Sequence, residues 1–211
     1  MLDADRELIE RIRHRLAAGT LPGAEGQYRM AHVLRKNYGK APATSRRASV
    51  LALLYPKDEV LTLLLIQRTS PAGDRHAGQI GFPGGSVEDG DRDAAHTALR
   101  EANEEVGIDP DAVDVLGELS PLYIPVSEFL VNPFVGLVEQ PPALQLQESE
   151  VARVLELPFR AFLDPASRIE KEIELTSGLV LRDVPHYRIG EELVWGATAM
   201  MIAELTALLE A

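Results

Sequence analysis

The chain has 211 residues, of which 45% are hydrophobic and 26% are charged, enough apolar sequence for one globular domain with a sizeable core. Its formal net charge is −12, and no segment combines clustered Lys and Arg with aromatic residues, which argues against polymeric nucleic acid as a partner. The sequence contains no cysteine, so disulfides, thiolate zinc sites and cysteine nucleophiles are excluded.

The N-terminal stretch predicts an amphipathic helix, because apolar residues recur at helical spacing and stop before Gly19. These apolar residues are Leu8, Ile9, Ile12 and Leu16. Acidic residues and arginines are mixed through the same stretch, which is not typical of a secretory signal. The apolar run at residues 61–66 is far too short to cross a bilayer. We expect a cytoplasmic protein that does not associate with membranes.

Two short strands are predicted at residues 48–55 and 60–67, where β-favouring apolar residues are bounded by turn-forming residues. Residues 56–59 form a turn-like segment that would join these strands into a hairpin. The segment before them is polar and basic without a clear period. We therefore expect an N-terminal helix with a polar lead-in at residues 1–45, and a main domain at residues 46–211 that includes a C-terminal helix.

Residues 70–90 are rich in Gly, Pro and Asp. A helix is predicted after them at residues 92–106, with Asp91 as its N-cap and Gly107 at its C-terminal end. Its apolar face is predicted to contain Ala95, Ala98, Leu99, Ala102 and Val106. Three further strands are expected at 113–119, 134–139 and 151–157, and a closing helix at 197–209. This order of elements indicates a mixed α/β fold.

Three glutamates on the helix at 92–106 give the strongest chemical signal. Glu101, Glu104 and Glu105 occupy positions i, i+3 and i+4, so a helix projects their carboxylates to one side. Like charges at this spacing repel one another, and a divalent cation bound by carboxylate oxygens would offset the repulsion. Glutamate pairs are also common on solvated helix faces, so the run alone does not distinguish a metal site from an ordinary surface.

Two neighbouring features favour the metal site. Arg100 precedes Glu104 by four residues and could orient one carboxylate while the others remain free for a metal ion. Before the helix, the sequence Phe82-Pro83-Gly84-Gly85 predicts a tight turn, where a backbone carbonyl can approach an ion closely.

These residues together resemble the Nudix box, the signature of the Nudix hydrolase family, which reads G-x5-E-x7-R-E-U-x-E-E-x-G-U with U apolar. Gly85 matches the first glycine, and residues 100–108 match the second half of the box. Fourteen residues separate Gly85 from Arg100, one more than in the general box, and Asp91 lies near the place of the middle glutamate. The resemblance implies an α/β/α sandwich around a mixed β-sheet, with helical extensions at the N- and C-termini.

The longer loop is similar to that of the coenzyme A pyrophosphatase branch of the family. So is the upstream sequence, in which residues 64–69 are followed by Arg75-His76-Ala77-Gly78-Gln79-Ile80 and then by the glycine turn. The resemblance covers roughly residues 45–205. It implies hydrolysis of coenzyme A to 4′-phosphopantetheine and adenosine 3′,5′-bisphosphate, with Mg²⁺ or Mn²⁺ as the cofactor.

The same resemblance implies a role for each candidate residue. The metal would be bound by Glu101, Glu104, Glu105 and the carbonyl of Gly85, and one of these carboxylates would act as the base. Glu150 or Glu148, just before the strand at 151–157, would supply an assisting catalytic glutamate, and ordinary surface acids are an equal alternative for both.

Substrate binding would use three side chains of the upstream motif. Arg68 and Arg75 would pair with phosphates of the substrate, because a guanidinium matches a phosphate with two hydrogen bonds. His76 would hydrogen-bond the substrate, although a single histidine is more often structural.

Two other functions stay open on the sequence alone. One is a Nudix pyrophosphatase that acts on ADP-ribose or another nucleoside diphosphate derivative, and the other is a non-catalytic Nudix-fold binding module. The presence of the arginine and all three glutamates of the box favours an enzyme. We expect a small-molecule nucleotide as the ligand. The apolar stripes of the terminal helices suit either a homodimer or packing on their own domain.

Overall fold

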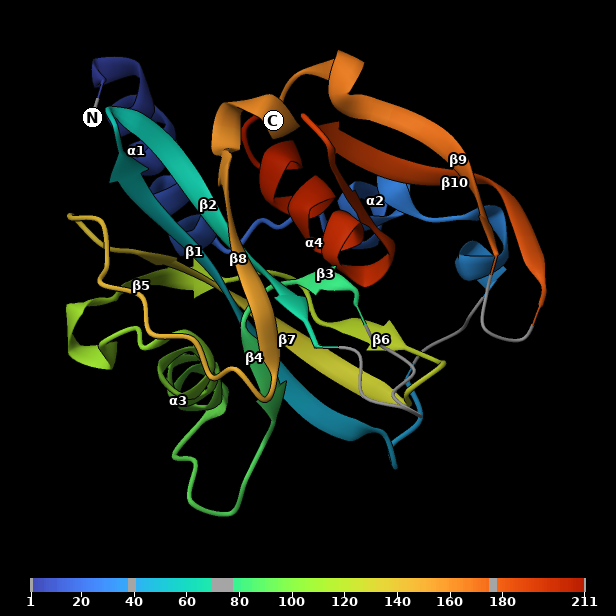
Figure 1. The fold of residues 1–211 in the computed structure, drawn as a ribbon, viewed down its shortest axis with the longest axis horizontal. Coiled ribbons are helices and arrows are strands. Elements are labelled where there is room, and N and C mark those ends of the chain that lie inside the picture. Colours follow the sequence, from blue (N-terminus) through green and yellow to red (C-terminus); the bar gives the residue numbers. More distant parts are fainter. Residues whose placement is uncertain (1, 38–40, 70–77, 175–177, 211) are drawn as a thin grey trace.

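The central strand of the fold is β1 (Arg46–Lys57), which is apolar on both of its faces. Because side chains alternate along a strand, Leu51 and Leu53 belong to one core cluster, whereas Ala52 and Leu54 belong to another. A sheet buried on both faces needs a covering layer on each side. The computed structural model, which describes residues 2–37, 41–69, 78–174 and 178–210, has these two layers (Figure 1).

The main sheet has the strand order β3-β2-β1-β7-β5, in which β1 and β7 (Phe129–Leu137) are parallel and the other pairs are antiparallel. Three strands pair beside this path: β4 with β1, β6 with β7 and β8 with β2. The remaining strands of this sheet are β2 (Val60–Arg68), β3 (Ile80–Gly81), β4 (Gly84–Ser86), β5 (Asp114–Glu118), β6 (Leu122–Ile124) and β8 (Val151–Pro158). The mixed sheet predicted from the sequence is confirmed.

One edge of β1 has two successive partners, and this splits the sheet. Residues 54–57 of β1 pair with β2, whereas residues 48–50 pair with β4. Beyond the split, the same edge of β2 pairs with β3 at Ile66 and Gln67, whereas β8 pairs along the other edge of β2. The end of β2 and the short strand β4 therefore lie on either side of an opening in the sheet.

Helices cover both faces of the sheet (Figure 1). On one face, α3 (Ala94–Val106) buries Ala98, Ala102 and Val106 against β1. The other face is covered by α1 (Asp3–Ala18) and α4 (Gly196–Ala207), with the short α2 (Gly23–Gln27) beside α4. Short 3-10 helices lie at Tyr28–Met30, Val33–Asn37, Pro110–Ala112, Phe159–Phe162 and Pro165–Ser167. The α/β/α sandwich and its two terminal helices agree with the prediction.

Two buried carboxylates attach the N-terminal segment to the rest of the fold. Asp5 accepts a hydrogen bond of 3.0 Å from the backbone N–H of Leu61. Glu204 on α4 accepts backbone hydrogen bonds from Gly23 and Ser120, each of 3.1 Å. The apolar face of α1 also belongs to the larger core cluster. The division of the chain at residue 45 remains a prediction.

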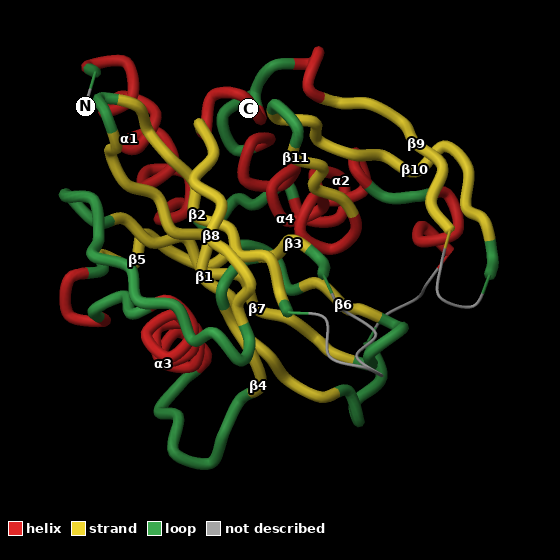
Figure 2. The backbone as a smooth tube through the Cα atoms, viewed as in Figure 1, coloured by secondary structure: helices red, strands yellow, loops and turns green. Residues whose placement is uncertain are grey.

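A second, antiparallel sheet of three strands lies beside α4 (Figure 2) and was not predicted. It consists of β9 (Arg168–Glu174), β10 (Val180–Ile189) and β11 (Glu192–Trp195). The predicted strands of the main sheet were correct in place, but β7 begins at Phe129 instead of residue 134. The glycine-rich segment after β2 contains β3 and β4, which were not predicted either.

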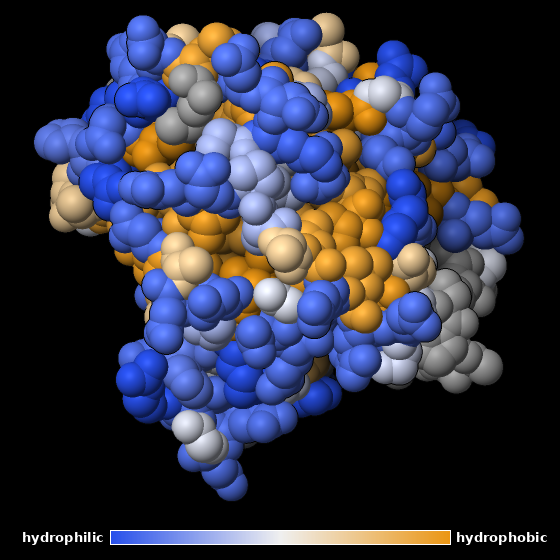
Figure 3. Space-filling model, turned by 60° about the vertical axis from the view of Figure 1, so that its left-hand side comes forward, coloured by the Kyte–Doolittle hydropathy of each residue, from blue (hydrophilic) through white to orange (hydrophobic). Residues whose placement is uncertain are grey.

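The surface in Figure 3 is mainly hydrophilic, with a continuous hydrophobic area near the middle of that face. Within the described ranges, no helix has the length and apolar character needed to cross a membrane.

Candidate active site

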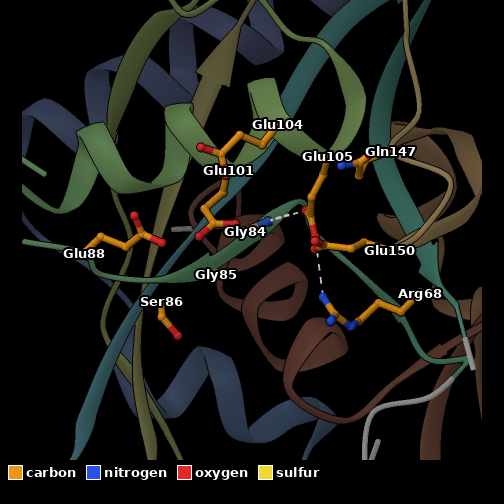
Figure 4. A pocket seen from close by; sticks show the side chains of 10 residues that line it. All are labelled: Arg68, Gly84, Gly85, Ser86, Glu88, Glu101, Glu104, Glu105, Gln147 and Glu150. Carbon is orange, nitrogen blue, oxygen red and sulfur yellow. Dashed lines mark hydrogen bonds and ion pairs between the residues drawn. The ribbon is translucent and has the colours of Figure 1, made fainter. Parts of the chain in front are cut away.

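A cavity of about 460 Å³ opens between α3, β4 and the loop that leads into β8. Its walls are formed by Arg68, Gly84, Gly85, Ser86, Glu88, Glu101, Glu104, Glu105, Gln147 and Glu150. The carboxylates of Glu101, Glu105 and Glu150 gather near the two glycines, whereas the side chain of Ser86 points away from them (Figure 4). Of the predicted site residues that the structure describes, the cavity brings together all except Glu148 and Arg100, and Arg100 contacts the lining residue Glu101.

The two glycines of β4 allow close approach on two sides, Gly85 towards α3 and Gly84 towards β1. A Cβ atom on Gly85 would lie 2.4 Å from a carboxylate oxygen of Glu101, so any side chain would displace this carboxylate. Gly84 has φ of 154° and a hypothetical Cβ 2.3 Å from the backbone oxygen of Ser49. The predicted tight turn is instead the start of strand β4, and the approach of a backbone carbonyl to an ion stays a prediction.

Glu105 is the most deeply buried carboxylate of the cavity, with 2% of the residue exposed. It accepts a 2.9 Å hydrogen bond from the backbone N–H of Gly84 and forms a 3.4 Å ion pair with Arg68. Burial raises the pKa of Glu105 to about 7, and the Gly84 and Arg68 contacts only partly oppose this effect. The neighbouring carboxylates of Glu101 and Glu150 raise the pKa further.

The other two glutamates of α3 share Arg100. Its guanidinium contacts Glu101 at 3.1 Å and Glu104 at 3.0 Å. Burial raises the pKa of Glu101, whose side chain is 15% exposed, whereas the Glu104 side chain is 56% exposed. The prediction that Arg100 orients Glu104 agrees with this contact.

Asp91 holds Arg100 in place. Its carboxylate is 1% exposed and accepts hydrogen bonds from Arg100 Nε at 2.9 Å and from Arg100 Nη2 at 3.1 Å. It also accepts hydrogen bonds from the hydroxyl of Thr97 and the backbone N–H of Glu88. The hydrogen bonds from Arg100 are the main reason why the pKa of Asp91 is far below its usual range, and the other contacts lower it further.

The predicted start of the helix was wrong. The N-cap of α3 is Asp93, whose side chain accepts a hydrogen bond from the backbone N–H of His96, and the helix begins at Ala94. Asp91 is unavailable as a cap because it binds the guanidinium instead. The predicted end at Gly107 is confirmed, with φ of 74°.

Glu150 reaches the cavity on a loop that is attached at both ends. The backbone N–H of Gln147 donates a 2.9 Å hydrogen bond to the carbonyl of Glu105, at the last turn of α3. At the other end of the loop, the backbone N–H of Thr69 donates a 2.8 Å hydrogen bond to the carbonyl of Glu150. The hydroxyl of Thr69 donates a 3.0 Å hydrogen bond to the carbonyl of Ser149. Glu150 lines the cavity and Glu148 is not among its lining residues.

The donor atoms of the cavity suit a hard divalent cation, because they are carboxylate and backbone oxygens. Burial of Glu101 and Glu105 without a cation is unfavourable, as their raised pKa values show, and a bound cation would relieve it. Within the described part of the chain, however, no three His, Asp or Glu side chains are so arranged that they could hold a metal ion. Two of the α3 carboxylates, those of Glu101 and Glu104, pair with Arg100 instead.

Three residues of the cavity were not singled out by the sequence: Ser86, Glu88 and Gln147. Glu88 follows the glycine turn closely, which was a usable signal, whereas nothing in the sequence marks Gln147. Of the predicted substrate-binding residues, Arg68 lines the cavity, and Arg75 and His76 lie outside the described residues.

Comparison with known proteins identifies the family of the chain. Residues 45–173 match the model of the NUDIX domain. The chain is similar to the uncharacterized Nudix hydrolase NudL of Cronobacter sakazakii, with 38% identity over 82% of this chain and 88% of that protein. It is also similar to NudL of Pectobacterium atrosepticum, with 40% identity over 68% and 73% of the two chains. A MutT/nudix family protein of Enterococcus faecalis shares the fold, with a TM-score of 0.53 and 18% identity over 88% of this chain and 73% of that chain.

Proposed function

Because the chain belongs to the Nudix hydrolase family, we propose that its carboxylate cavity hydrolyses the pyrophosphate bond of a nucleoside diphosphate derivative, with coenzyme A as the preferred substrate. The observation that carries this proposal is the gathering of Glu101, Glu105 and Glu150 against the glycine strand β4. The products from coenzyme A would be 4′-phosphopantetheine and adenosine 3′,5′-bisphosphate.

In this proposal Glu101, Glu104, Glu105 and the carbonyl of Gly85 would hold Mg²⁺ or Mn²⁺. Nudix hydrolases generally use divalent metal ions. Such ions would neutralise the phosphate oxygens and polarise the attacking water. Arg100, fixed by Asp91, acts as a positioning residue because it holds Glu101 on the cavity side of α3.

Two further residues complete the proposed chemistry. Glu150 faces the same cavity as the α3 carboxylates and is our candidate for the base that accepts a proton from water. Arg68 is 36% exposed and only weakly paired with Glu105, so its guanidinium can turn to a phosphate oxygen of the substrate. Arg75 and His76 keep their proposed role in substrate binding on the strength of the sequence motif alone.

The choice of coenzyme A depends on the upstream motif and on the extra residue before α3. ADP-ribose or another nucleoside diphosphate derivative is the alternative substrate, and a non-catalytic binding module is the alternative function. The proposal also includes a cytoplasmic location, a small-molecule nucleotide as the ligand, and either a monomer or a homodimer.

A substrate panel tests the proposal. Purified protein is incubated with Mg²⁺ and, separately, with coenzyme A, ADP-ribose and NADH, and the products are separated by chromatography. A higher kcat/KM for coenzyme A than for the other two supports the proposal. Cleavage of only the other two would overturn the coenzyme A assignment, and binding without cleavage of all three would favour the non-catalytic module.

A further inference from the structure

Arg46, at the first position of β1, has a fixed but exposed guanidinium. Its Cζ atom lies 4.0 Å from the centre of the Phe129 ring, a cation–π contact between two strands that are paired at this position. Within the described ranges no Asp or Glu forms an ion pair with Arg46, although the chain has a net charge of −12. The contact with Phe129 occupies the face of the guanidinium, and its N–H edge remains available for an anion.

Strand register places Arg46 near Ser86, at the wall of the cavity and on the sheet face opposite to α3. Ala48 of β1 pairs with Ser86 of β4, which lines the cavity, and the pairing continues as the N–H of Val87 donates to the carbonyl of Arg47 at 3.1 Å. Arg46 precedes Ala48 by two residues, so its side chain is on the same sheet face as that of Ser86. Diagonal neighbours of this kind in adjacent strands are about 7 to 8 Å apart.

Arg47 is on the opposite face of β1, the face shared with Ser49 and Gly85 and covered by α3. Both arginines are exposed and both carry one positive charge. They differ in the sheet face that they occupy and in the aromatic ring beneath Arg46. The adjacent pair therefore provides a matched comparison for the effect of position.

We propose that Arg46 binds an anionic group of the substrate that is separate from the scissile diphosphate, namely a phosphomonoester on the ribose. This proposal rests on the proposed function, since the scissile diphosphate must occupy the carboxylate cavity. An arginine fixed on an aromatic ring loses less conformational freedom when it binds phosphate than a free side chain does, which favours a specific contact over diffuse attraction.

The test compares coenzyme A with 3′-dephospho-coenzyme A, which lacks this phosphate, in the wild type and in Arg46→Ala, Arg46→Lys and Arg47→Ala. We expect the wild type to have the higher kcat/KM for coenzyme A. Arg46→Ala should reduce kcat/KM for coenzyme A by about 10- to 100-fold, as loss of one charge-assisted phosphate contact predicts, and leave that for the dephosphorylated compound unchanged. Arg46→Lys should retain part of the preference, and Arg47→Ala should retain it fully.

A binding measurement separates failure of this proposal from failure of the proposed function. Calorimetric titration of the same variants with adenosine 3′,5′-bisphosphate and with adenosine 5′-monophosphate does not depend on turnover. Tighter binding of the bisphosphate by the wild type, lost in Arg46→Ala, would support the Arg46 site even if coenzyme A is not cleaved. Equal losses in Arg46→Ala and Arg47→Ala, or no preference for the bisphosphate in the wild type, would overturn it.

Discussion

Glu105→Gln is expected to make the protein more stable without metal while removing most of its activity. In the folded chain this carboxylate is buried, and the pKa of Glu105 is raised from the usual 4.5 to about 7. The unfolded chain releases this proton at lower pH, so the free energy of unfolding falls as pH rises from 4.5 through about 7. Above that range, the full cost of the buried charge is present.

The size of the effect follows from the same pKa. One pKa unit corresponds to about 1.4 kcal/mol, so ionised Glu105 lowers the stability of the folded state by up to about 3 kcal/mol. Glutamine keeps the volume and an oxygen that can accept from the N–H of Gly84. We therefore expect a gain of about 1 to 3 kcal/mol in Glu105→Gln at about pH 8 in a chelator, and a gain below about 1 kcal/mol near pH 5.

Urea unfolding of the wild type and of Glu105→Gln at both pH values, in EDTA, measures these differences. Glu104→Gln is the matched control, because the Glu104 side chain is exposed and pairs with Arg100, so its replacement should give no comparable gain. Saturating Mg²⁺ should stabilise the wild type and have a smaller effect on Glu105→Gln. A variant less stable than the wild type at about pH 8 in EDTA would refute the reasoning.

Other substitutions test the construction of the site. Gly85→Ala should lower the Mg²⁺ affinity measured by calorimetry, because the new Cβ atom would lie 2.4 Å from the carboxylate of Glu101. Gly90→Ala is the control and should leave the affinity unchanged, because a Cβ atom there has nothing within 4 Å. Equal effects of the two substitutions would contradict this role of Gly85. Asp91→Asn should lower the free energy of unfolding by about 3 kcal/mol, because it removes the buried carboxylate that binds Arg100. An unchanged midpoint of urea unfolding would exclude a stabilising role for this ion pair. Ser49→Ala should leave the melting temperature unchanged or raise it, because the buried hydroxyl of Ser49 has no hydrogen-bond partner among the described residues; a clear decrease would reveal a missed contact.

The sequence predicted α3 and its carboxylates well, because a helical period and a stopping glycine are local signals. It did not separate Asp91 from Asp93 at the start of the helix, since both are good capping residues and only the position of Arg100 decides between them. The short strands β3 and β4 were missed for a similar reason. Glycine and proline favour loops locally, and β4 is a strand only because β1 provides its hydrogen bonds.

The second sheet and part of the cavity depend on contacts that the sequence does not reveal. In β9 the charged residues Glu170, Lys171 and Glu172 interrupt the apolar alternation, so the strand has no clear pattern. Gln147 enters the cavity because its backbone binds the last turn of α3, a contact between distant parts of the chain. Glu150 was predicted from its place before β8, and the same loop attachment explains how it reaches the α3 carboxylates.

The most direct test of the account is the stoichiometry of cleavage of coenzyme A in oxygen-labelled water, with Mg²⁺ and with EDTA, followed by mass spectrometry. The account predicts equal amounts of 4′-phosphopantetheine and adenosine 3′,5′-bisphosphate, with label in a product phosphate, in Mg²⁺ and not in EDTA. It also predicts almost no product from Glu105→Gln. Product formation that is independent of metal, or unchanged in Glu105→Gln, would contradict the assignment of the cavity as the active site.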